Sequence, residues 1–185
     1  MSEPGVIRTL SSREVFRSPW LALREDEVEF PNGSRGHYAV VEKPDFVLVL
    51  AREDDGFWMV EQYRYPIGRR EWEFPQGGWP PGRTGAPHEL AAAELREETG
   101  HTADTLTHLG RLHAAVGFCG QGFDVYLATG LTPGEPQRED TESDMVARWC
   151  ADADVRAMLR TGQLADAHSV AALALWDATG GLSAP

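Results

Sequence analysis

The apolar run FVLVLA, at residues 46–51, constrains the fold more than any other segment of the chain. A strand with one solvated face alternates apolar and polar residues, whereas an unbroken apolar run that contains valines is typical of a buried strand. The turn residues EDDG follow this run and lead into a second strand-like segment at 57–65. The two segments therefore predict a sheet that contains a buried strand.

Helices are predicted at three places further along the chain. Pro87 suits the first turn of a helix and Gly100 suits its end, so the first helix is expected over about 87–99. A long Pro/Gly-rich loop precedes it, with a short strand at 72–74. The remaining predicted elements are helices near 152–161 and 166–178 and strands near 105–116, 123–129 and 145–150. This order indicates a mixed α/β domain.

The segment before the apolar run predicts a β-hairpin over 20–43. Asn32-Gly33 stands between the strand-like runs WLALREDEVEF and HYAVVEK, and this dipeptide is a strong hairpin signal. A length of 185 residues suits one domain with a sizeable core. The expected organisation is an N-terminal tail at 1–14 and a single domain at 15–180.

Charge and composition argue against several classes of protein. The formal net charge of −12 disfavours binding to nucleic acid, which is itself a polyanion. Cys119 and Cys150 form neither a disulfide framework nor a CxxC pair. The N-terminus carries Glu3 and lacks an apolar signal segment, and no apolar run approaches the roughly 18 residues of a membrane span. We therefore expect a cytoplasmic protein without a membrane partner.

Three glutamates share one face of the predicted helix at 87–99. Glu94, Glu97 and Glu98 stand at i, i+3 and i+4, where like charges repel by roughly 0.2–0.5 kcal/mol per pair. Carboxylates in this register suit hard divalent cations such as Mg²⁺, which prefer oxygen ligands and often bind substrate phosphates as well. On spacing alone, a solvated acidic surface explains the three glutamates equally well.

The surroundings of this helix favour the metal-binding interpretation. The loop EFPQGGWPPG before it is rich in glycine, which allows a backbone to approach a ligand closely. Loop and helix together resemble the Nudix hydrolase signature, G-x5-E-x7-R-E-U-x-E-E-x-G-U, where U is a bulky aliphatic residue. Glu94 to Gly100 match its E-L-x-E-E-x-G half without a gap. The flanking segments resemble ADP-ribose pyrophosphatase-like members over roughly residues 15–178.

Two positions depart from the signature. Ala93 stands where the family has arginine, and the position of the first glutamate is taken by Arg83 or Gly85, depending on the direction of counting. In the family the arginine is thought to hold the box glutamates in place, so its loss is expected to loosen the site without removing its metal ligands.

The resemblance implies an α/β/α sandwich with a mixed sheet and an N-terminal β-hairpin extension. It also implies hydrolysis of the diphosphate of ADP-ribose or a related nucleotide sugar to a nucleoside monophosphate and a sugar phosphate. The implied cofactor is Mg²⁺, with Mn²⁺ as an alternative, and the implied assembly is a homodimer. The expected metal ligands are Glu94, Glu97, Glu98 and a backbone carbonyl near Gln76.

Further site residues are expected outside the helix. The resemblance places a general base on the late loop QREDTESD, where Glu142 is the first candidate and Glu139 the second; a solvated acidic loop is the alternative. Arg64 is a candidate phosphate ligand or a surface ion-pair residue. Glu73 is a candidate substrate-facing group or a loop anchor.

Aromatic and histidine side chains are weaker candidates. Trp20 or Trp79 is expected either to stack on an adenine ring or to serve packing, with Trp20 the preferred substrate-binding residue. His113 is interpreted as a core histidine. Glu97 and Glu98 are the remaining catalytic candidates, as metal ligands.

Two other functions are compatible with the sequence. The departures at Ala93 and at the first box glutamate are compatible with a catalytically weak domain that senses a nucleotide ligand. Alternatively, the enzyme acts on another substrate, such as a dinucleotide or a biosynthetic intermediate. A panel of substrates separates these hypotheses.

Overall fold

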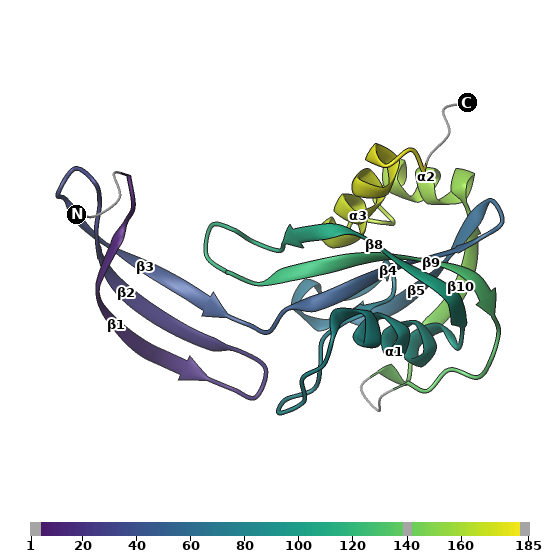
Figure 1. Cartoon of the computed structure of the whole chain (residues 1–185), viewed down its shortest axis with the longest axis horizontal. Coiled ribbons are helices and arrows are strands. Elements are labelled where there is room, and N and C mark those ends of the chain that lie inside the picture. Colours follow the sequence, from purple (N-terminus) through teal and green to yellow (C-terminus); the bar gives the residue numbers. More distant parts are fainter. Residues whose placement is uncertain (1–4, 139–141, 182–185) are drawn as a thin grey trace. The chain divides into compact units, whose positions relative to one another are not determined.

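The computed structural model describes residues 5–138 and 142–181, and the chain divides into two compact units. The N-terminal unit contains the residues up to Asp45, together with 80–82 and 113–122. The second unit contains 46–79, 83–112 and the residues from 123 onward. Figure 1 follows the chain by colour through both units.

The N-terminal unit is built on a three-stranded antiparallel sheet in the order β1 (Arg8–Arg17), β2 (Ala22–Glu29) and β3 (Arg35–Glu42). The predicted hairpin is confirmed as the β2–β3 pair. Gly33 takes a positive φ of 83° in its turn, and the side chain of Asn32 accepts a hydrogen bond of 3.0 Å from the Ser34 N–H. Strand β1 adds a third member and includes residues that were expected to lie in a tail.

The second unit holds a mixed sheet. Its main strands follow the order β10-β5-β4-β9-β8, in which β4 is parallel to β9 and antiparallel to β5. Strand β6 pairs with β5, and the two-residue β7 pairs with β4. The strands are β4 (Phe46–Glu53), β5 (Gly56–Arg64), β6 (Arg69–Glu73), β7 (Gln76–Gly77), β8 (Thr102–His113), β9 (Gly122–Thr132) and β10 (Val146–Ala151), and the 3₁₀ turn η1 covers Tyr65–Ile67.

Helices cover both faces of this sheet, as Figure 1 shows. Helix α1 (Pro87–Thr99) lies on one face, and α2 (Asp152–Thr161) and α3 (Ala167–Ala178) lie on the other. The expected α/β/α sandwich with a mixed sheet is therefore confirmed. The three helices begin within one residue of their predicted positions, because proline, glycine and aspartate mark their ends.

The apolar run at 46–51 is β4, and its alternating side chains enter two separate cores. Leu48 and Leu50 pack in the cluster that contains Trp176 of α3. Val47 and Val49 pack in the cluster that contains Leu95 of α1. Since both faces of β4 are covered, no position in the run is left for a polar residue.

Two smaller expectations are settled by the structure. Cys119 and Cys150 are both buried and free, as the absence of a cysteine pattern indicated. His113 is exposed at the end of β8, so its interpretation as a core histidine was wrong. Within the described residues, the helices are all too short or too polar to span a membrane.

Candidate active site

Two of the three glutamates that were expected to share one face of α1 are buried. Glu94 is 8% exposed and Glu98 is 1% exposed, whereas Glu97 is only partly buried. Their four-residue spacing places Glu94 and Glu98 one turn apart on the face of α1 that meets the rest of the unit. The solvated-surface explanation is therefore wrong for these two residues, because carboxylates are almost never fully buried without a partner or a function.

Strand β7 approaches this buried face closely. A Cβ atom added at Gly77 would lie 2.5 Å from Oε2 of Glu94 and 2.6 Å from Oε1. Only glycine lets the backbone come this near to the carboxylate. The glycine-rich loop therefore brings its backbone close to a candidate metal ligand, Glu94, as its glycine content predicted.

Glu98 lies where several negative charges accumulate. Its Oε2 accepts a 3.3 Å hydrogen bond from the backbone N–H of Gln76. Burial raises the pKa of Glu98 well above its ordinary value, and the charges of Glu94 and Glu142 raise it further, against the opposing effect of the Gln76 N–H. A carboxylate in such surroundings is stabilised either by a proton or by a cation.

Glu73 and Arg64 form an ion pair at the edge of this group. Arg64 Nε donates to Glu73 Oε1 at 2.6 Å, and Arg64 Nη2 donates to the other carboxylate oxygen. Glu73 is 2% exposed, and this pair raises the pKa of the Arg64 guanidinium. The bonds hold the Glu73 carboxylate against Arg64, whose side chain stays 40% exposed.

The Gln76 side chain connects Glu73 to the start of α3. Its Nε2 donates to Glu73 Oε2 at 2.9 Å and to Asp166 Oδ2 at 3.1 Å. Asp166 caps α3 by accepting from the Ser169 N–H at 2.9 Å and from the Ser169 hydroxyl at 2.7 Å. The residues DAHS predict the helix start at Asp166, but no local pattern indicates that this cap also reaches the loop before α1.

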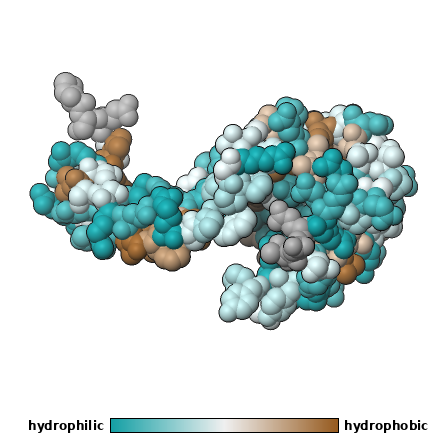
Figure 2. Space-filling view, turned by 90° about the horizontal axis from the view of Figure 1, so that it is seen from below, coloured by the Kyte–Doolittle hydropathy of each residue, from teal (hydrophilic) through white to brown (hydrophobic). Residues whose placement is uncertain are grey.

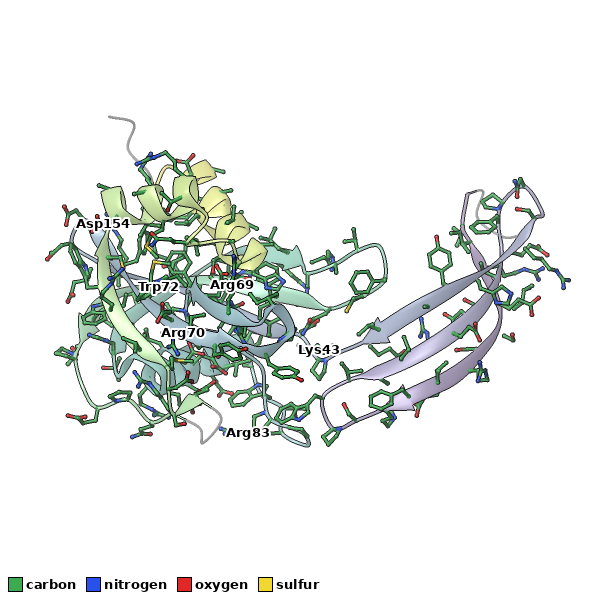
Figure 3. All side chains as sticks on the ribbon, turned by 180° about the vertical axis from the view of Figure 1, so that it is seen from behind. Lys43, Arg69, Arg70, Trp72, Arg83 and Asp154 are labelled. Carbon is green, nitrogen blue, oxygen red and sulfur yellow. The ribbon has the colours of Figure 1, made fainter. Side chains whose placement is uncertain are left out.

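The segment that begins at Glu142 is fastened to the sheet. Arg70 Nη1 and Nη2 donate to Asp144 Oδ2 at 2.6 Å and to its backbone carbonyl at 2.9 Å, and Arg70 Nε donates to Glu61 at 2.7 Å. Figure 3 labels Arg70 on β6. Glu142 is partly buried, and its charge acts on Glu98. The alternative base, Glu139, lies outside the described residues.

The two tryptophan candidates have different surroundings. Trp20 lies in the turn between β1 and β2 of the N-terminal unit and is 59% exposed. Trp79 is partly buried, and its ring packs against Gly85 and beneath the Arg83 guanidinium, 4.2 Å from the ring centroid. Trp79 therefore contacts residues of its own loop.

The donor set of this site fits a hard divalent cation. Glu94 and Glu98 offer carboxylate oxygens on one helix face, and the missing side chain at Gly77 lets the backbone of β7 approach the Glu94 carboxylate. Over the described residues, no three histidine, cysteine, aspartate or glutamate side chains are arranged to hold a metal ion by themselves.

Comparison with known proteins agrees with this geometry. Residues 42–173 match the family model described as the NUDIX domain, and residues 7–41 match that of the nucleoside diphosphate sugar hydrolase N-terminal domain. The chain is 37% identical to an ADP-ribose pyrophosphatase of Mycobacterium tuberculosis, over 96% of this chain and 86% of that protein. It is 35% identical to an ADP-ribose pyrophosphatase of Bacillus subtilis, over 75% of each.

A solved structure, described as the crystal structure of ADP compounds hydrolase, has the same fold. It superposes with a TM-score of 0.82 at 24% identity and covers 98% of this chain and 100% of its own. The resemblance seen in the acidic helix and its flanks is thus confirmed over most of the sequence, in spite of Ala93. The chain belongs to the Nudix hydrolase family.

Proposed function

We propose that this protein hydrolyses the diphosphate of ADP-ribose or a related nucleotide sugar, giving a nucleoside monophosphate and a sugar phosphate. The observation that carries the proposal is the buried pair Glu94 and Glu98, which faces the backbone of β7 in a chain of the Nudix family. Two relatives that match at least three quarters of the chain are named ADP-ribose pyrophosphatases, which supports this substrate class.

The metal proposed for the site is Mg²⁺, with Mn²⁺ as a substitute. Glu94, Glu98 and the backbone carbonyl of Gln76 would hold it, with Glu97 as a further ligand. A bound cation would neutralise the diphosphate and lower the pKa of a water molecule for attack. Burial of Glu94 and Glu98 supports these ligands, because a dry site strengthens their interaction with a cation.

The chain's own residues have separate roles in this proposal. Glu142 takes the proton of the attacking water, and its influence on Glu98 supports a place near the reaction. Arg64 binds a phosphate oxygen while Glu73 orients its guanidinium. Trp20 stacks on the base. For Trp20, a large exposed side chain in the N-terminal unit is the supporting observation.

We also propose that the protein is a homodimer formed through its N-terminal unit. Val15, Phe16 and Trp20 are about half exposed or more, at 49%, 55% and 59%. Figure 2 shows brown, hydrophobic residues on the visible surface of this unit. A second copy would cover such side chains. Light scattering on the purified protein tests this, and a monomeric mass at micromolar concentration contradicts it.

The substrate is tested with a panel of nucleotide sugars and dinucleotides in the presence of Mg²⁺ or Mn²⁺. We expect turnover of ADP-ribose or a close relative, with the monophosphate as one product. Turnover of a dinucleotide alone would keep the enzyme class and change the substrate. Tight binding of a nucleotide in calorimetry, without release of product, would contradict the hydrolase proposal and favour a nucleotide sensor.

A further inference from the structure

Strand β6 carries two buried carboxylates, each paired with an arginine. Glu71 is 4% exposed and bonds Arg69 Nη2 at 2.7 Å, and Glu73 is 2% exposed and binds Arg64 through two bonds. Arg64 and Arg69 are register partners at the end of the β5–β6 pair. Figure 3 labels Arg69 there. Because the two glutamates are two residues apart, both side chains project to the same face of the strand.

Both glutamates reach the start of α3, but by different paths. Oε1 of Glu71 accepts directly from the backbone N–H of Ala165 at 2.7 Å. Glu73 reaches Asp166 only through the Gln76 side chain, which donates to both carboxylates. Neighbouring residues at the start of α3 are thus held by neighbouring carboxylates of β6, and only the second connection passes through the loop before α1.

Gln76 is held on three sides. Its side-chain amide bonds Glu73 and Asp166, and its backbone N–H donates to Glu98. Since β7 has only two residues, its ladder with β4 gives this backbone little support of its own. Asp166 is itself fixed by Ser169, whose hydroxyl also accepts from the Phe74 N–H at 3.0 Å.

We propose that Asp166 is a positioning residue of the active site, which acts by holding the Gln76 amide and thereby keeping the Gln76 backbone on Glu98. The inference rests on the proposed function, in which Glu98 and the Gln76 carbonyl are metal ligands. Groups that orient metal ligands typically change metal affinity or activity by about 10- to 100-fold when they are removed. The helix cap at Asp166 thus has a second task beyond stabilising α3.

The test separates these two tasks in the full-length protein by measuring Mn²⁺ affinity. Asp166→Ser keeps a helix-capping side chain but is too short to reach Gln76. We expect its Kd for Mn²⁺ to rise about tenfold. Asp166→Asn keeps an oxygen for both bonds, and we expect it to bind Mn²⁺ within about twofold of the wild type.

Glu71→Gln provides the matched control. Glu71 lies on β6 with Glu73, is buried like Glu73 and holds the residue next to Asp166, but it has no bond to Gln76. We expect this variant to lower the melting temperature without changing the Kd for Mn²⁺. The proposal is overturned by a normal Kd in Asp166→Ser, by an equal loss in Glu71→Gln, or by a loss in Asp166→Asn as large as in the serine variant.

A measurement without metal distinguishes failure of this inference from failure of the proposed function. In NMR spectra of the metal-free protein, Asp166→Ser should shift both the side-chain and the backbone amide signals of Gln76. Unshifted signals overturn the inference. A wild-type protein that binds no Mn²⁺ and hydrolyses no member of the substrate panel overturns the proposed function, and with it the metal-site role of Asp166, whatever the Gln76 signals do.

Discussion

The two units of this protein use charged residues in opposite ways. In the N-terminal sheet, opposite charges pair with each other and are mostly exposed, as in Arg8–Glu29 and Arg13–Glu25, and the buried Asp26 is paired with Arg24. In the second unit, the like-charged carboxylates of Glu94 and Glu98 are both buried, and burial raises the pKa of Glu98 well above its ordinary value. Exposed pairs cost little and contribute little, whereas buried like charges are unfavourable and indicate a function.

The two units also differ in the number of apolar residues that they bury. The second unit encloses two hydrophobic clusters on the two faces of β4. In the N-terminal sheet, only Ala22 and Val28 are buried hydrophobic residues of the described strands. The second unit therefore has more packing energy to offset buried charges of like sign than the N-terminal unit, in which the buried Asp26 has an arginine partner.

Truncation of the core of the second unit should have the largest effect on stability. Leu50 is fully buried in β4, and Leu50→Ala is expected to lower the free energy of unfolding by about 2–5 kcal/mol. Urea titration followed by fluorescence measures it. Ile67→Ala, at a position that is 55% exposed, serves as the control and should change stability by less than about 0.5 kcal/mol. A similar loss of stability in both variants would contradict the view that buried apolar side chains stabilise the second unit.

Removing one buried charge should reduce catalysis and leave the fold intact. Glu98→Gln is expected to lower kcat at least tenfold, because the variant loses a metal ligand of the proposed site; tenfold corresponds to about 1.4 kcal/mol in the barrier. Its melting temperature should stay equal or rise, since the buried charge is unfavourable without a cation. Unchanged kinetics would exclude Glu98 as a ligand.

The raised pKa of Glu98 gives the second unit a distinct dependence on pH. Between the ordinary pKa of 4.5 and the raised value, the folded protein binds more protons than the unfolded chain. The contribution of Glu98 to stability is therefore present below about pH 4.5 and is lost as pH rises through that window. Thermal unfolding of the metal-free protein and of Glu98→Gln across this range measures it. Parallel curves for the two proteins would show that Glu98 is not the titrating group.

Breaking an exposed ion pair of the N-terminal sheet should have the smallest effect. Arg8 and Glu29 have side chains that are 64% and 31% exposed. Arg8→Ala is expected to change the free energy of unfolding by less than about 0.5 kcal/mol, with activity unchanged. Calorimetry and the hydrolysis assay check both statements. A loss above 1 kcal/mol would mean that this sheet depends on its charges after all.

The parts of the fold that depend on local patterns could be predicted from the sequence. The helix at 87–99 is predicted from proline and glycine at its ends and is confirmed, whereas the metal-ligand role of Glu94 and Glu98, which rests on their spacing and on the resemblance to the Nudix signature, stays a prediction. The proline and the glycine lie within a few residues of the feature that they predict. The same holds for the hairpin at Asn32-Gly33.

What sequence reasoning missed depends on residues far apart in the chain. Asp166 and Gln76 are 90 positions apart, and no local pattern indicates that their side chains meet. Strand β1 was missed for a related reason: its residues RTLSSREVFR are mostly polar, and their partners are supplied by β2. Expectations for Glu142 and Trp20 stay predictions until activity is measured.

Strand β4 has a consequence that reaches beyond packing. Both elements that carry the proposed metal ligands contact this strand. Leu48 pairs with Gln76 of β7 and Val47 pairs with Gly77. Val47 and Val49 pack against α1 on the face of the sheet that this helix covers. A change of side-chain volume on the α1 face, such as Val49→Ile, would move the helix but not its backbone partner in β7. Small changes of volume on the α1 face of β4, which touch no site residue, would then alter metal binding.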